Sequence, residues 1–236
     1  MTQNKKKIIY VGLSADILHE GHINILKAAN KLGDVIVGLL TDKAISSYKK
    51  FPLLNYKQRE IILKNIKMVK KVIPQTTLDY RPNLKQVMPN FVVHGDDWKT
   101  GVQKKTRNQV ILTLKKWGGK LIELKYTKNI SSTSIKSKLI NRITPASRVS
   151  ILRRMLNNNN LIRVLESHSP LSGLIAENVR IENGKVAKEF HAMWSSSLTD
   201  SSVKGKPDNQ ALDFSSRFSG LGDMLDVTTK PLIFDA

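Results

Sequence analysis

The chain has 236 residues and no cysteine, which excludes a disulfide framework, a thiolate zinc site and a cysteine nucleophile. With 40% hydrophobic residues it can bury one large core or two modest ones, which excludes disorder throughout. The net charge of +20 arises in residues 1–150, which hold 29 basic and 9 acidic residues, whereas residues 151–236 hold ten of each. We therefore expect two regions of different character.

Strands and helices alternate through the first region. Short apolar runs predict strands at 7–12, 35–40, 71–74, 91–94 and 120–125. Apolar residues at helical spacing predict helices at 23–30, 56–69, 83–88 and 106–117, with a further helix entered at Ser131. This alternation predicts an α/β fold with a Rossmann-like, doubly wound parallel sheet.

The pattern breaks between Arg142 and Ser147, around Pro145, where the charge also changes. We therefore expect one domain at residues 1–145 and a second at 146–236. In the second, helical segments are expected at 150–156 and 161–165, and strands at 188–194 and 231–235.

A candidate phosphate site follows the first strand, where open α/β sheets bind ligands. Asp16, His19, Gly21 and His22 lie there, at the start of a predicted helix. Three features there favour the binding of a phosphoryl group. The helix start has free backbone N–H groups, Gly21 lets the backbone come close to a phosphate, and the two imidazoles can donate hydrogen bonds. The alternative is that the two histidines are incidental surface residues.

Two further motifs follow other predicted strands. Gly95, Asp96, Asp97 and Trp98 come directly after the strand at 91–94. Ser131, Ser132 and Thr133 lie at a loop-to-helix junction. The three hydroxyl residues could bind a phosphate or serve only as an ordinary helix cap. Since the carboxyl ends of parallel strands meet at one edge of a sheet, the three motifs predict a single site.

These motifs together resemble the cytidylyltransferases of the H-x-G-H superfamily, most closely the glycerol-3-phosphate type. The matching segments are DILHEGH (16–22), LGDVIVGLLTD (32–42), NYKQRE (55–60), VVHGDDW (92–98) and ISSTSIK (130–136). The resemblance implies transfer of CMP from CTP to a phosphonate or small phosphorylated alcohol, with release of pyrophosphate. It also implies Mg²⁺ as cofactor and a homodimer.

The resemblance assigns roles to individual residues. It implies catalysis by His19, His22 and Lys49, and contact of Lys49 and Arg59 with the acceptor's phosphate. It implies nucleotide binding by Ser14, Asp16, Gly21, Gly95, Asp96, Ser131, Ser132 and Thr133. The family's Arg-Thr-Glu-Gly is replaced here by residues 126–129, Tyr-Thr-Lys-Asn, which removes a bidentate phosphate ligand. We therefore expect an acceptor other than glycerol phosphate.

Residues 150–236 resemble the beginning of phosphoenolpyruvate mutase, a parallel α/β barrel of the isocitrate lyase superfamily. The matching segments are 166–179, 190–208 and 228–236. The resemblance places Trp194 and Ser196 at the substrate, Asp208 on a mobile lid and Asp235 at a magnesium ion. The second metal-binding aspartate would be residue 237, so we expect a truncated barrel without mutase activity. The fusion favours 2-aminoethylphosphonate as the acceptor.

Other functions are weaker expectations. One is an adenylyltransferase that uses ATP. Another is a fragment of a bifunctional mutase whose first domain binds a nucleotide without catalysis, although both motif histidines are kept. The scattered lysines indicate a solvated surface, so no nucleic-acid partner is expected. Without a membrane-length apolar run or a signal-peptide core, we expect a soluble cytoplasmic protein with no membrane partner.

Overall fold

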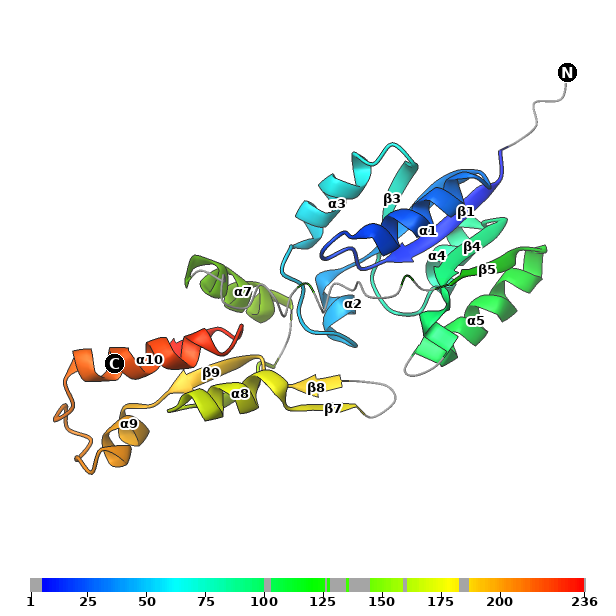
Figure 1. Ribbon diagram of the computed structural model, residues 1–236. Helices are drawn as coiled ribbons and strands as arrows, with labels where there is room; N and C mark the ends of the chain where they lie inside the picture. Colours follow the sequence, from blue (N-terminus) through cyan, green and yellow to red (C-terminus); the bar gives the residue numbers. More distant parts are fainter. Residues whose placement is uncertain are drawn as a thin grey trace, which may run out of the picture. The chain divides into compact units, whose positions relative to one another are not determined.

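The computed structural model describes residues 6–99, 103–125, 127, 135, 145–158, 161–182 and 187–235. The chain divides into two compact units, Met1–Ile135 and Lys136–Ala236 (Figure 1). This division falls earlier than the boundary expected after residue 145, and helix α7 (Pro145–Asn158) lies entirely within the second unit.

The first unit contains a five-stranded sheet in the order β3-β2-β1-β4-β5, with every neighbouring pair parallel. Its strands are β1 (Ile8–Leu13), β2 (Asp34–Leu40), β3 (Val69–Gln75), β4 (Phe91–Gly95) and β5 (Lys120–Leu124). The predicted doubly wound parallel sheet is thereby confirmed. The order of strands reverses between β1 and β4, which is where such sheets bind ligands.

Helices connect these strands. They are α1 (Glu20–Asn30), α2 (Asp42–Ser46), α3 (Tyr56–Lys64), α4 (Arg81–Val87) and α5 (Lys104–Leu114), with the 3₁₀ helices η1 (Asp96–Lys99) and η3 (Lys115–Trp117). The helix predicted at 56–69 is too long, because α3 ends at Lys64 and β3 already begins at Val69. Ile66 and Val69 still pack on the core from the turn and the strand, so their helical spacing was misleading.

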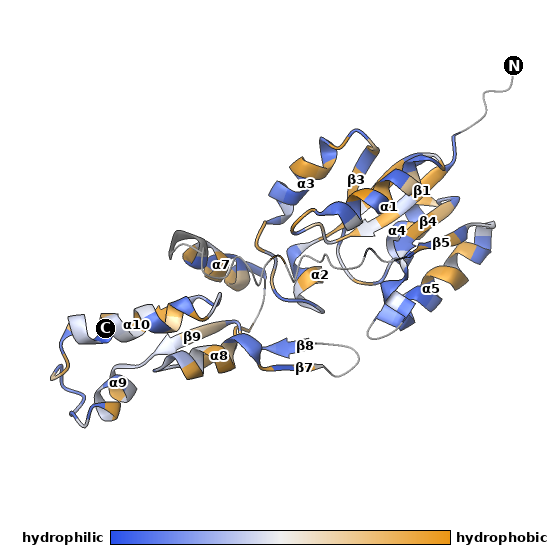
Figure 2. Ribbon diagram, viewed as in Figure 1, coloured by the Kyte–Doolittle hydropathy of each residue, from blue (hydrophilic) through white to orange (hydrophobic). Residues whose placement is uncertain are grey.

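The sheet separates two hydrophobic cores. Alternate residues of β1, Ile9, Val11 and Leu13, lie in one core together with residues of α1 and α3. Tyr10 lies in the other core with residues of α4 and α5. In Figure 2, α1, α3 and α5 each carry hydrophilic and hydrophobic stretches, as helices that cover a sheet do.

Two strand glycines make room for buried tyrosines. A Cβ on Gly38 would lie 1.7 Å from Tyr10 Oη, and one on Gly12 would lie 2.2 Å from Tyr80 Oη. The Tyr10 hydroxyl donates to Gln75 Oε1 at 2.7 Å and accepts from Asn83 Nδ2 at 3.0 Å. These bonds fix the tyrosine against the backbone of β2.

The second unit has a three-stranded parallel sheet, β10-β9-β6, and an antiparallel pair, β7-β8. The strands are β6 (Val164–Glu166), β7 (Arg180–Glu182), β8 (Ala187–Glu189), β9 (Ala192–Ser195) and β10 (Leu232–Phe234). In the described part of this unit, the helices besides α7 are α8 (Pro170–Asn178), α9 (Ser197–Val203) and α10 (Phe214–Asp226). None of the helices in the described ranges has both the length and the apolar character that crossing a membrane requires.

Two predictions for this unit need correction. The helix predicted at 161–165 is wrong, because Val164 and Leu165 pair as strand β6 with Ala192 and Met193. A short apolar run does not distinguish the two structures. The strand predicted at 188–194 is two strands, β8 and β9, whereas the strand predicted at 231–235 is confirmed as β10.

A buried arginine fastens α7 to the rest of the second unit. Arg148 donates to the carbonyl oxygens of Leu225 at 2.7 Å, Thr228 at 2.8 Å and Lys230 at 3.1 Å. These acceptors lie at the end of α10 and just before β10. The helix is therefore an integral part of the second unit.

Replacing Gly38 by alanine should destabilise the first unit by about 1–3 kcal/mol, because the new methyl group would overlap the Tyr10 hydroxyl. Chemical denaturation followed by circular dichroism measures this loss. Gly220→Ala is the matched control, since nothing beyond the neighbouring residues and backbone of its own helix lies within 4 Å of the position that its new methyl group would take. Equal stability of the two variants would contradict the close packing described for Gly38.

Candidate active site

The motif histidines lie at the start of α1 and hold its first turn. His19 is the N-cap, and its Nδ1 accepts from the Gly21 N–H at 3.2 Å. His22 Nδ1 accepts from the His19 N–H at 3.3 Å, and the two ring centroids are 4.0 Å apart. A Cβ on Gly21 would lie 3.0 Å from the His19 ring, so glycine permits this arrangement. We call His19 and His22 the histidine pair.

These bonds determine which ring nitrogen carries the proton. A ring nitrogen that accepts a hydrogen bond is unprotonated, so each neutral ring has its proton on Nε2. Burial, the neighbouring His19 and Lys49 lower the pKa of His22 to about 4. Burial and Lys49 also lower the pKa of His19. At neutral pH the histidine pair therefore offers two uncharged Nε2–H donors.

Lys49 lies in the loop after α2, between β2 and α3. Its side chain is exposed, and its Nζ lies 5.2 Å from the centre of the Tyr48 ring. Its positive charge lowers the pKa of His19, His22 and His94. One ammonium group thus acts on three imidazoles, of which two follow β1 and the third, His94, lies near the end of the neighbouring strand β4.

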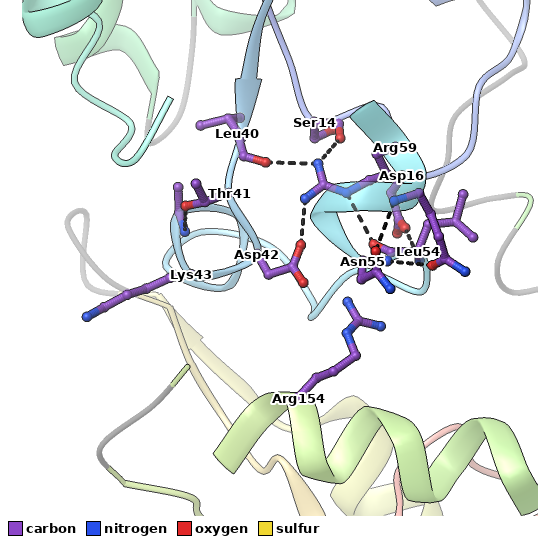
Figure 3. A network of polar contacts seen from close by, with 12 residues as sticks. Ser14, Asp16, Leu40, Thr41, Asp42, Lys43, Leu54, Asn55, Arg59 and Arg154 are labelled. Atoms are coloured by element: carbon purple, nitrogen blue, oxygen red, sulfur yellow. Dashed lines mark hydrogen bonds and ion pairs between the residues drawn. The ribbon is translucent and has the colours of Figure 1, made fainter. Parts of the chain in front are cut away.

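Arg59 is the main departure from expectation. Its side chain is fully buried and forms an ion pair with Asp42 Oδ1 at 2.6 Å. The guanidinium also donates to the carbonyl oxygens of Ser14 at 2.6 Å, Leu40 at 2.8 Å and Leu54 at 3.1 Å (Figure 3). The expectation that Arg59 contacts the acceptor's phosphate therefore needs correction, because protein groups already surround it.

Two other expected nucleotide ligands belong to the same polar network. Asp16 is 4% exposed, and its Oδ1 accepts from the Leu54 N–H at 3.0 Å (Figure 3). Ser14 contributes its carbonyl oxygen to Arg59. Between them Ala15 has a φ of +48°, an uncommon conformation for a residue with a side chain. The Asp16 carboxylate is thus directed to the loop backbone.

Gly95 and Asp96 lie at the carboxyl end of β4, as the sequence indicated. Gly95 is buried as the last residue of β4, and Asp96 begins η1 with its Oδ2 4.0 Å from Lys99 Nζ. Next to them the His94 ring stacks on Trp98, with centroids 3.7 Å apart and planes within 5°. The sequence placed Trp98 in the motif that follows the strand at 91–94, but it did not single out His94.

A charged pair supports the Trp98 ring. The Trp98 indole donates to Glu123 Oε1 at 2.8 Å, and Arg107 binds both oxygens of that carboxylate at 2.8 Å each. Hydrogen bonding to Arg107 is the main reason that the pKa of Glu123 falls to about 2. The indole is therefore held by an ionised carboxylate across neutral pH.

Ser131, Ser132 and Thr133 lie outside the described residues. Thr127, a few positions earlier, accepts a hydrogen bond from Asn24 Nδ2 of α1 at 3.3 Å. A Cβ on Gly21 would lie 3.7 Å from Thr127 Cβ. At Thr127 the chain has thus returned from β5 to the first turns of α1, beside the histidine pair.

The residues expected at a mutase site all lie in the second unit. Trp194 is 40% exposed on β9, Ser196 is a buried N-cap of α9, and Asp235 follows β10. Asp235 Oδ2 accepts from Ser197 Oγ at 3.4 Å, whereas Asp208 is exposed in the loop between α9 and α10. Across the described ranges, no three histidine, aspartate or glutamate side chains form a group that could hold a metal ion.

Comparison with known families supports two assignments. The family model described as cytidylyltransferase-like matches residues 9–138, more than half of the chain. The model described as phosphoenolpyruvate phosphomutase matches residues 152–236. The first match runs a little past the division between the two compact units, and the second lies wholly within the second unit.

Individual curated cytidylyltransferases are similar to part of the chain. A glycerol-3-phosphate cytidylyltransferase of Bacillus subtilis is 31% identical over 137 residues, which are 57% of this chain and 97% of the relative. One from Bacillus spizizenii is 38% identical over 97 residues, 40% of this chain and 74% of the relative. An ethanolamine-phosphate cytidylyltransferase of Dictyostelium discoideum is 34% identical over 145 residues, 59% of this chain but only 38% of the relative.

Arg59→Lys should destabilise the first unit by about 3–5 kcal/mol, because one ammonium group cannot serve Asp42 and three carbonyl oxygens at once. Urea denaturation measures the loss. Arg81→Lys is the matched control, since Arg81 pairs with Asp79 at the surface. A normally stable Arg59→Lys protein would instead point to a role in ligand binding.

Acid should weaken the first unit partly through His22. The pKa of His22 is about 4 in the folded protein and ordinarily 6.5, so the unfolded chain binds more protons between these values. The free energy of unfolding should therefore fall as pH drops from about 6.5 towards 4. In His22→Gln, whose side chain can still accept from the cap N–H, this fall should be smaller. Identical pH profiles would contradict the burial of a neutral His22.

Proposed function

Because the chain belongs to the cytidylyltransferase-like family, we propose that its first unit transfers CMP from CTP to a small phosphorylated acceptor and releases pyrophosphate. The observation that carries this proposal is the histidine pair, whose two Nε2–H donors lie at a helix N-terminus beside Lys49. Such donors suit negative charge that develops on a phosphoryl group.

In the proposed reaction an oxygen of the acceptor's phosphate or phosphonate attacks the α-phosphorus of CTP. The bond from that phosphorus to the bridging oxygen of the β-phosphate breaks, and pyrophosphate leaves with the electron pair. The histidine pair donates hydrogen bonds to the α-phosphate oxygens, and the Lys49 ammonium offsets their charge. No covalent intermediate with the protein is required, since positioning and electrostatic stabilisation supply most of the catalysis in such transfers.

Magnesium is proposed to arrive with the nucleotide. In the described residues no three histidine, aspartate or glutamate side chains form a group that could hold a metal ion, so these residues do not fit a magnesium cage built from protein carboxylates. Mg²⁺ commonly binds substrate phosphates and keeps several waters. When bound to the triphosphate it would reduce the negative charge that the attacking oxygen meets, and no residue's role above depends on it.

We propose a phosphonate, with 2-aminoethylphosphonate first, as the acceptor. The support is the second unit, which matches the phosphoenolpyruvate phosphomutase model over residues 152–236. A phosphomutase that acts on phosphoenolpyruvate would move its phosphorus from oxygen to carbon and so supply compounds with a carbon–phosphorus bond. A cytidylyltransferase fused to it could activate such a phosphonate by attaching CMP. A homodimer and a cytoplasmic location stay predictions that rest on the resemblance and the sequence alone.

His19→Asn and His22→Gln should each lower kcat by about 10²–10³-fold, because each removes one Nε2–H donor from the transition state. Asparagine is a good N-cap and glutamine suits the third helical position, so both variants should keep the first turn of α1. The assay is pyrophosphate release with CTP and Mg²⁺, using 2-aminoethylphosphonate, glycerol 3-phosphate and ethanolamine phosphate as acceptors.

His168→Asn, which changes an exposed histidine of the second unit, is the control in that assay and should keep wild-type kcat. Full activity of both site variants would remove the histidine pair from the mechanism. A clear preference for ATP over CTP in the wild-type protein would replace the proposed nucleotide.

A further inference from the structure

Asn24 and Thr127 form a hydrogen bond that connects α1 to the chain after β5. Asn24 Nδ2 donates to Thr127 Oγ1 at 3.3 Å, between residues 103 positions apart in the sequence. Asn24 lies one helical turn beyond Gly21, so these two residues share a face of α1. The point that a Cβ on Gly21 would occupy is 3.0 Å from His19 Cε1 and 3.7 Å from Thr127 Cβ. The threonine side chain therefore lies beside the ring of His19.

This bond determines how the Thr127 hydroxyl can act. A threonine hydroxyl has one hydrogen to donate and accepts hydrogen bonds through its oxygen. The Asn24 amide donates to that oxygen, and in the described part of the chain no acceptor for the hydroxyl hydrogen is found. Thr127 is only half-buried, so a ligand can reach this hydrogen. The hydroxyl is thus an oriented donor.

The candidate active site around Thr127 also offers donors. The histidine pair contributes two Nε2–H groups, and Lys49 contributes an ammonium group. Phosphate oxygens only accept hydrogen bonds, and a triphosphate carries many of them. A hydroxyl beside His19 adds a neutral donor for such a ligand. It does so without adding to the positive charge of Lys49, which already lowers the pKa of both His19 and His22.

We propose that Asn24 is a positioning residue for the transfer reaction, which keeps the Thr127 hydroxyl directed at an oxygen of the CTP triphosphate. Asn24 itself does not touch the nucleotide. Its amide occupies the threonine oxygen, so the hydroxyl hydrogen is left for the phosphate. A side chain that could only accept would bind this hydrogen and turn the hydroxyl away from the ligand. This inference rests on the proposed function and deepens it, because it gives α1 a role in nucleotide binding beyond the histidine pair.

The test measures how tightly the full chain binds a CTP analogue in which a methylene bridge between the α- and β-phosphorus blocks transfer. Titration calorimetry with Mg²⁺ present gives the affinity. Asn24→Asp replaces the amide by a carboxylate of nearly the same size, which can only accept. It should weaken binding about tenfold, the scale of one hydrogen bond to a charged group. Thr127→Val, which removes the hydroxyl, should weaken binding by a similar factor, whereas Thr127→Ser should keep the wild-type affinity.

A double variant separates the direction of the hydroxyl from the negative charge that aspartate adds. In the Thr127→Val protein, Asn24→Asp should have little further effect, because the hydroxyl that it would turn away is absent. The double variant should therefore bind the analogue about tenfold more weakly than the wild-type protein. A loss of about a hundredfold would overturn the inference, since the aspartate would then act by its charge alone.

Asn30→Asp, the same change at the exposed last residue of α1, is the matched control and should keep the wild-type affinity. Wild-type affinity in Asn24→Asp, or no binding of the analogue by the wild-type protein, would also overturn the inference. The assay needs no turnover. The expected affinities without pyrophosphate release from CTP would contradict the proposed function and leave the role of Asn24 standing, and pyrophosphate release with additive losses would do the reverse.

Discussion

The candidate active site depends on one guanidinium group that lies beneath it. Arg59 joins Ser14 after β1, Leu40 at the end of β2, Asp42 at the start of α2 and Leu54 before α3. The loop after β1 leads to the histidine pair, and the segment after β2 carries Lys49. Because a buried arginine without its partners is costly, these segments are held together as one assembly. Arg59 thus acts on the site by positioning the loops that carry it.

Uncharged donors explain how a strongly basic protein can use histidine at a phosphate site. Positive charge near an imidazole lowers its pKa, and burial lowers it further. At His22 both effects act, together with a hydrogen bond that requires an unprotonated Nδ1. The net positive charge of the first region can then attract an anionic nucleotide, while the imidazoles contribute directed hydrogen bonds. The positive charge thus comes from the basic side chains of the first region, and the directed hydrogen bonds come from the imidazoles.

Much of this architecture could be predicted from the sequence. The apolar runs of β1, β2 and β4 are continuous because parallel strands are covered on both faces, and the histidine motif follows the first of them. The role of Arg59 could not be predicted, because its acceptors come from separate segments and an arginine on a helix is ordinarily exposed. The strand β6 was also missed, because its short apolar run has no period of its own and its pairing with β9 is distant in sequence.

The central claim is that His19 and His22 are neutral and carry their protons on Nε2. Long-range proton–nitrogen NMR spectra of the histidine rings at pH 7 test it directly, recorded with and without a CTP analogue in which a methylene bridge between the α- and β-phosphorus blocks transfer. The account predicts that both rings have an unprotonated Nδ1 and a protonated Nε2, and that the Nε2 signals shift when the analogue binds. A proton on Nδ1 of either ring would contradict the account, and so would Nε2 signals that do not shift when the analogue is added.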